Sequence, residues 1–218
     1  MALDSKAGII SSALLELGAE EVQTDPDNLE AADPNDDLAI QSFAIYETTK
    51  LQLFNKYPWS WALERKQLQE VSPQSTDANT QRSQYTHVYL VPEATIGNIR
   101  GVYQNLDIEE PALSYGWALR GTFIYADYNP LYAEYLRDVG EAAYPGLFIS
   151  ALVQELCHRF CLAIIQDPQQ ANMYRRNAME ALADATRVDS QSKPTNRVRR
   201  YRLVDAHYGG YPRYRLPN

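Results

Sequence analysis

The sequence predicts an α+β fold: a helical bundle with an inserted antiparallel β-sheet region and an extended basic C-terminal arm. Apolar residues recur with the helical period of about 3.6 near both ends of the body and with a period of two between them. The last 28 residues show no core pattern. We therefore expect the bundle to comprise residues 1–64 and 145–190, the inserted β-region 65–144 and the arm 191–218.

Size and composition are those of one soluble domain with an insertion. The chain has 218 residues, a mass of 24.8 kDa and 45% hydrophobic residues. Two cysteines make no disulfide framework, and the first six residues show no signal-peptide pattern. The longest apolar run, 147–153, is far shorter than the roughly 20 residues that span a bilayer. We expect a soluble protein made in the cytoplasm, with no direct membrane anchoring.

Two helices are predicted before the β-region. The first covers residues 8–18, and Gly18 can close it in the left-handed conformation. Residues 19–36 are acidic and contain two prolines, so they form a loop. The second helix covers 36–57 and ends before Pro58. Its expected apolar face consists of Ile40, Phe43, Ala44, Leu51 and Phe54.

The middle of the chain reads as antiparallel strands. Residues 85–91 alternate, and 99–103 and 132–139 are further extended candidates. Residues 117–119 and 122–125 flank Arg120 and Gly121, which is a hairpin signal. The polar stretch 72–84 is a long loop, and loops of this length are usually functional or mobile.

Two more helices follow Pro145. Residues 147–165 are apolar on most sides and are expected to form the central helix. Asp167 can cap a last helix over 168–187, with Pro168 in its first turn. The small residues on one face of that helix allow close approach to a neighbour. That face consists of Ala171, Tyr174, Ala178, Ala181, Leu182 and Ala185.

Charge is divided unevenly along the chain. The net charge of −8 argues against a protein whose whole surface binds nucleic acid. Residues 191–218, however, hold seven basic residues and one acid, whereas the remaining 190 residues hold 13 basic and 27 acidic residues. An arm of charge +6 on a body of charge −14 is expected to bind something acidic: nucleic acid, another protein or a neighbouring copy.

The arm mixes arginine with tyrosine. Arginine donates from a fixed fork and stacks on aromatic rings, so this composition is typical of a binding segment. The arm residues that we expect to contact such a partner are Arg197, Arg199, Arg200, Tyr201, Arg202, Tyr208, Tyr211, Arg213, Tyr214 and Arg215.

A metal site is the first chemical alternative. Cys157, His158 and Cys161 lie within about one helical turn, and Glu155 with His158 matches Glu-x-x-His. Zinc needs about four ligands, and a di-metal bundle needs a second copy of the motif, which the sequence lacks. We therefore expect small core cysteines and no metal.

Catalysis is the second alternative. The sequence has no nucleophile elbow, phosphate loop or dinucleotide fingerprint. The acids available for glycoside hydrolysis sit in no motif that sets the separation of two carboxyl groups. They are Glu64, Asp107, Glu109, Glu110, Asp127, Glu134, Asp138 and Glu141. We expect no cofactor and no enzyme.

Several motifs, in their order along the chain, carry a resemblance. They are residues 15–18 (LELG), 55–62 (NKYPWSWA), 64–66 (ERK), 85–92 (YTHVYLVP), 119–125 (LRGTFIY) and 144–152 (YPGLFISAL). Over residues 8–188 the chain resembles the tail tubular protein A, or head-to-tail adaptor (connector), family of short-tailed bacteriophages. Within the second motif, Pro58, Trp59 and Trp61 mark the junction of helix and β-region. We expect at least one of these tryptophans to be buried and to fix the insertion to the bundle.

The resemblance implies a structural ring subunit of the virion, in the tail or neck region. Copies would form a homo-oligomeric ring, a dodecamer, which docks on the portal protein. The ring would extend the DNA channel and provide the platform for the tail nozzle protein and the tail fibres. Genome DNA would pass through the lumen without specific binding, because acidic walls repel phosphate.

Other functions remain open at this point. Some relatives have been credited with cell-wall hydrolysis, so a tail-associated peptidoglycan hydrolase is the second hypothesis. An adaptor of a long-tailed phage would have the same build, and nucleic-acid binding through the arm is a weaker third. The adaptor is favoured because the sequence lacks a catalytic constellation and its arm is rich in arginine and tyrosine.

Overall fold

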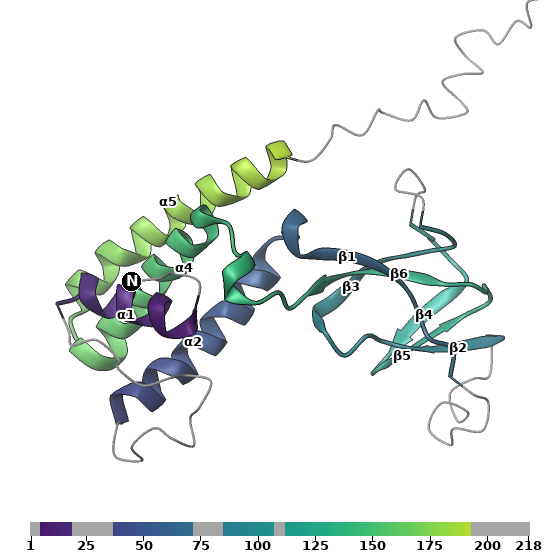
Figure 1. Cartoon of the computed structure of the whole chain (residues 1–218), viewed down its shortest axis with the longest axis horizontal. Coiled ribbons are helices and arrows are strands. Elements are labelled where there is room, and N and C mark those ends of the chain that lie inside the picture. Colours follow the sequence, from purple (N-terminus) through teal and green to yellow (C-terminus); the bar gives the residue numbers. More distant parts are fainter. Residues whose placement is uncertain (1–4, 19–36, 72–84, 107–111, 193–218) are drawn as a thin grey trace, which may run out of the picture.

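The computed structural model describes residues 5–18, 37–71, 85–106 and 112–192 and has an α+β fold. In these residues four α-helices and six β-strands are found, and all six strands lie between the second and third of these helices in the chain. The helices lie at one end of the molecule and the strands at the other (Figure 1). The predicted loops at 19–36 and 72–84 fall outside the described residues.

Helix α1 (Lys6–Glu16) forms where the sequence predicts one, but it begins and ends two residues earlier than the predicted 8–18. The side chain of Ser5 caps it by accepting a hydrogen bond from the Gly8 amide at 3.2 Å. Gly18 follows the helix with φ of 72°, a conformation that glycine adopts without strain. Ile9, Ile10 and two further apolar residues of α1 are buried.

Helix α2 (Asp37–Lys56) forms where predicted, but its buried face is partly different. Phe43 and Phe54 are buried as expected, whereas Ile40, Ala44 and Leu51 are exposed. The buried face is rotated by roughly a quarter turn from the predicted one. The residues that complete it are Ala39, Ser42, Tyr46, Thr49, Lys50 and Leu53. Because several residues of this buried face are polar, the pattern of apolar residues in the sequence did not identify it.

The strands form two small antiparallel sheets instead of one. Strands β1 (Leu63–Gln67), β6 (Tyr132–Arg137) and β3 (Thr95–Tyr103) form the first sheet in that order. Strands β2 (His87–Leu90), β5 (Phe123–Ala126) and β4 (Trp117–Arg120) form the second in that order. The predicted hairpin is confirmed as β4–β5, with Arg120 opposite Phe123 and Gly121 at φ of 58°.

Residues 68–71 explain why there are two sheets. The Leu68 amide donates to the Leu131 carbonyl at 2.8 Å, beside the first sheet. The next residues pair with β2 of the second sheet, where the Val71 amide donates to the Val88 carbonyl at 2.8 Å. The chain thus leaves one sheet and joins the other. A separate small core lies between the strands, made of Leu68, Tyr89, Val102, Ile124, Ala126, Leu131 and Ala133.

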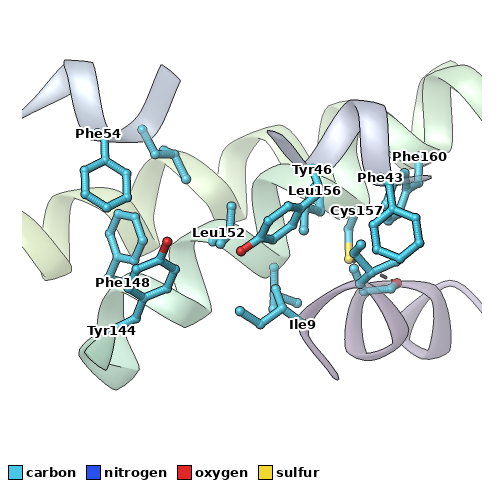
Figure 2. Packing of buried hydrophobic residues seen from close by; sticks show 14 of the residues in the cluster. Ile9, Phe43, Tyr46, Phe54, Tyr144, Phe148, Leu152, Leu156, Cys157 and Phe160 are labelled. Carbon is cyan, nitrogen blue, oxygen red and sulfur yellow. Dashed lines mark hydrogen bonds between the residues drawn. The ribbon is translucent and has the colours of Figure 1, made fainter. Parts of the chain in front are cut away.

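Helix α4 (Gly146–Phe160) is the central helix, and α1, α2 and α5 all pack against it. A π-helical turn, Cys161–Ile165, extends it. By length and composition this stretch, Gly146–Ile165, could cross a membrane, with a mean hydropathy of 1.5. In the structure it is the core helix of the molecule, as Figure 2 shows for Phe148, Leu152 and Leu156.

Helix α5 (Pro168–Ser192) extends five residues beyond the predicted end. The Asp167 carboxylate caps it by accepting from the amides of Gln169 at 2.9 Å and Gln170 at 3.2 Å, as predicted. Four members of the predicted apolar face, Ala171, Tyr174, Ala178 and Ala185, are buried. The alanines let α5 lie close along α4.

Candidate functional site at the junction of helices and strands

The chain passes between helices and strands twice. The first crossing, residues 57–62, leads from α2 to β1, and the second, 138–145, leads from β6 to α4. The main core continues across this junction, because Ile96 of β3 and Leu136 of β6 belong to the same buried cluster as the helices. The junction therefore determines how the strands sit on the helices.

An aromatic cluster fills the junction, with Phe148 at its centre. The ring centroid of Phe148 lies 5.0 Å from those of Trp59 and Trp61, 5.1 Å from Tyr144 and 5.4 Å from Phe54. All four contacts are edge-to-face, the geometry that the ring quadrupoles favour. Figure 2 shows Phe54, Tyr144 and Phe148 meeting in this cluster.

Trp59 confirms the expectation that one tryptophan of the junction is buried. Its side chain is 1% exposed, and its indole Nε1–H donates to the Leu53 carbonyl at 3.0 Å. Trp61 is partly buried and packs against the same core. Pro58 lies two residues after the end of α2, near the start of this segment. The two tryptophans thus join the first crossing to α4 through Phe148.

Asp189 of α5 holds the first crossing. Its carboxylate accepts the Ser60 amide at 3.1 and 3.2 Å and the Ser60 hydroxyl at 2.6 Å. Asp189 is only 8% exposed. A buried carboxylate needs such donors, because burial without them is costly.

Lys50 of α2 holds the second crossing. Its ammonium nitrogen lies 3.5 Å from a carboxylate oxygen of Asp138 and 3.6 Å from one of Glu141, both in the second crossing. Glu47 completes the set at 3.7 Å. Lys50 is 4% exposed, so these three carboxylates compensate a cation that is almost fully buried.

Two tyrosines line this charged group. The Tyr46 hydroxyl donates to Glu141 Oε1 at 3.0 Å. Burial, and then neighbouring groups that include Glu141, raise the pKa values of Tyr46 and Tyr144 well above that of a free phenol. Both phenols are therefore protonated at neutral pH, and Tyr46 acts as a hydrogen-bond donor.

The sequence analysis did not single out Lys50 and Asp189, although the position of each along its helix indicates a buried side chain. Asp189 lies four residues after Ala185 and so continues the apolar stripe of α5. Lys50 lies four residues after Tyr46 and seven after Phe43, on the buried face of α2. A charged residue in register with a buried face is the pattern to look for.

The cysteines are buried among helices. The Cys157 thiol donates to the Ala13 carbonyl at 3.4 Å, and burial raises the pKa of Cys157 and that of Cys161. His158 Nδ1 lies 2.9 Å from the Ala171 carbonyl. Within the described residues, no three His, Cys, Asp or Glu side chains are placed to hold a metal ion together.

The acids considered for hydrolysis lie among basic and hydroxyl groups. Glu134 pairs with Arg65 at 3.0 Å, and Glu64 accepts from the Tyr135 hydroxyl at 3.2 Å. Asp127 lies within 3.3 Å of the Thr86 amide. Asp138 and Glu141 surround Lys50, as described above. The remaining candidates, Asp107, Glu109 and Glu110, lie outside the described residues, as do the ten arm residues from Arg197 to Arg215.

Comparison with known proteins adds no relative. The chain matches no protein-family model. A search of curated proteins found no significant match.

Proposed function

We propose that this protein is a structural phage head-to-tail adaptor, a ring subunit that docks on a portal protein. In this proposal the four helices form the bundle that contacts the portal, and the strands form the inserted β-region. The ring extends the DNA channel and carries the tail nozzle. The resemblance in the order of the motifs is the starting point.

The observation that carries the proposal is the meeting of two of those motifs in space. Residues 55–62 contribute Trp59 and Trp61, and residues 144–152 contribute Tyr144 and Phe148, to one aromatic cluster. Stretches that are far apart in the sequence thus build one junction. The motifs behind the resemblance consequently have a shared structural task, which is to attach the strands to the helices.

The exposed face of α2 supports a contact between copies. Solvent faces of helices usually carry charges, yet between positions 40 and 55 of α2 the one charged side chain that reaches solvent is Glu47, which pairs with Lys6 and Lys50, and the other exposed residues are uncharged. These residues are Ile40, Gln41, Ala44, Thr48, Leu51, Gln52 and Asn55. A ring joins two different faces of each subunit, and an uncharged helix face can be buried without stranding a charge. In the proposed ring, this face of α2 contacts a neighbouring copy.

Charge supports the same proposal. Residues 1–190 carry −14 and residues 191–218 carry +6, so the arm of one copy finds complementary charge on the body of a neighbouring copy. An acidic body also suits a channel that DNA must traverse without being held. The hydrolase alternative gains nothing from the described acids, because Glu64, Glu134 and Glu141 contact tyrosine, arginine or lysine side chains.

The test is assembly. Purified full-length protein is mixed with a portal protein of a short-tailed phage, and the mass of the complex is measured by light scattering. We expect a complex with twelve copies of the 24.8 kDa chain per portal ring. A chain that stays monomeric beside the portal and digests peptidoglycan would contradict the proposal and support the hydrolase.

A further inference from the structure

Asp189, in the last turn of α5, forms hydrogen bonds with Ser60, just before the first strand of the β-region. Asp189 accepts three hydrogen bonds from Ser60, through the amide and the hydroxyl. The Ser192 hydroxyl lies 3.4 Å from the Ser60 hydroxyl, so the contact extends to the last described residue of α5. Ser60 lies three residues before the start of β1.

Asp189 has the role of a helix cap supplied from another helix. Ser60–Ala62 form a short 3-10 turn, and Trp59, at its N-cap position, makes no side-chain hydrogen bond to it. The Asp189 carboxylate accepts the first amide of this turn instead. A carboxylate in the last turn of its own helix is disfavoured by the helix dipole, so the position of Asp189 is explained by Ser60 and not by α5.

This contact joins the end of α5 to the first crossing. The residues after Ser192 begin the C-terminal segment, with its excess of basic residues, whereas Ser60 stands between Trp59 and Trp61 of the aromatic cluster. We propose that Asp189 is a positioning residue that couples the end of α5 to the orientation of the β-region. The end of α5 and residues 59–62 then open and close as one unit. This inference does not depend on the proposed ring.

The test uses hydrogen exchange on full-length variants. Asp189→Asn weakens the acceptor, and Ser60→Ala removes only the hydroxyl donor. Asp184→Asn is the matched control, because Asp184 lies on the same helix, is exposed and pairs with Arg187 at 3.0 Å. Loss of a charge-assisted hydrogen bond should speed amide exchange about tenfold to a hundredfold.

Coupling predicts that exchange rises together, and by a similar factor, at residues 59–62 and 189–192 in Asp189→Asn. Ser60→Ala should give a weaker rise at both places, and Asp184→Asn at neither. Spin labels at Met179→Cys and Thr122→Cys report the orientation of the strands, and Asp189→Asn should broaden their distance distribution. If Asp189→Asn does not fold, Ser60→Ala decides the question alone. Faster exchange at 189–192 with unchanged exchange at 59–62, in either variant, would overturn the proposal.

Discussion

Phe148 and Trp59 show how single residues hold the junction. Phe148 contacts three aromatic rings from the distant stretch 54–61 and a fourth from Tyr144, four residues before it. Each edge-to-face pair adds about 0.5–1.5 kcal/mol beyond burial of area. Trp59 combines such a contact with a buried hydrogen bond to the Leu53 carbonyl. The side chains here are large and in close contact. If one of them is shortened, its neighbours cannot easily move to fill the cavity.

Replacing Trp59 by alanine should therefore lower the free energy of unfolding by about 3–5 kcal/mol. Urea denaturation followed by circular dichroism measures this. The control is Tyr115→Ala, because Tyr115 is 78% exposed and its loss should change stability by less than about 0.5 kcal/mol. Equal effects of the two substitutions would contradict the role of Trp59.

Buried tyrosines and Cys157 should make the protein sensitive to alkali. Burial raises the pKa values of Tyr46, Tyr144 and Cys157 above the ordinary 10.0 for tyrosine and 9.0 for cysteine, and it raises that of Tyr89 to about 12. A raised pKa in the folded state means that the unfolded chain loses its proton first. Stability is thus fully present below pH 9 and falls as the pH rises above about 9–10, by about 1.4 kcal/mol per pH unit for each group.

The measurement is the free energy of unfolding from pH 7 to 11. Tyr46→Phe should flatten the alkaline slope, because phenylalanine has no proton to lose. Tyr115→Phe, at an exposed position, should leave the slope unchanged. A wild-type stability that does not decline up to pH 11 would show that these groups are not buried in solution.

At the scale of elements, what could be predicted depended on how regular each segment is. Helix α5 was predictable because its apolar stripe consists of alanines, Tyr174 and Leu182 with a proline and a capping Asp167 at its start. The face of α2 was not, because Thr49 and Lys50 are buried with partners that the sequence does not reveal: the Ile45 carbonyl and the carboxylates of the second crossing.

The two-sheet arrangement and the junction needed the structure for the same reason. A period of two identifies strands, but their partners depend on where the chain turns, and residues 68–71 pass from one sheet to the other. The buried Trp59 could be anticipated from its place between helix and strand. The role of Asp189 could not, because it lies 129 residues from Ser60.

The uncharged face of α2 gives a prediction for this element. Ala44→Glu and Leu51→Glu place a charge on exposed positions, so each should change the free energy of unfolding by less than about 0.5 kcal/mol. In the proposed ring each substitution buries an unpaired carboxylate and should abolish assembly, as measured by light scattering. The control is Met179→Glu on α5, where Met179 is 65% exposed. Unimpaired assembly of both α2 variants would remove α2 from the interface.

At the scale of the whole molecule, charge separates body from arm. The body has the helical core, the small core between the strands and the junction that connects them. The arm lies outside the described residues from position 193 onward, and its sequence has an excess of positive charge and no apolar periodicity, so we propose that it binds a partner. Because α5 continues to Ser192, the division belongs after that residue and not after Ser190.

Truncation after Ser192 tests the arm. The shortened protein should fold with an unchanged melting temperature, since both cores and the Asp189 contact remain, but it should no longer form a stable complex with the portal protein. A full-length variant with Arg199→Gln, Arg200→Gln and Arg202→Gln keeps the length of the arm but lowers its positive charge. It therefore tests whether charge is what binding to the portal protein needs. If the truncated chain binds the portal protein as tightly as the full chain, the arm does not contribute to this binding. Binding of the full chain to any nucleic acid, with steep salt dependence, would favour the DNA-binding alternative.

We propose that this chain forms the ring between portal and tail. The most direct measurement is electron cryo-microscopy of the virion that contains the chain, with its density fitted at the neck. We expect twelve copies around the DNA channel beneath the portal, with the helices toward the portal and α2 at the contact between neighbours. Density at the neck that cannot hold this fold, or density for this fold elsewhere in the particle, would contradict it.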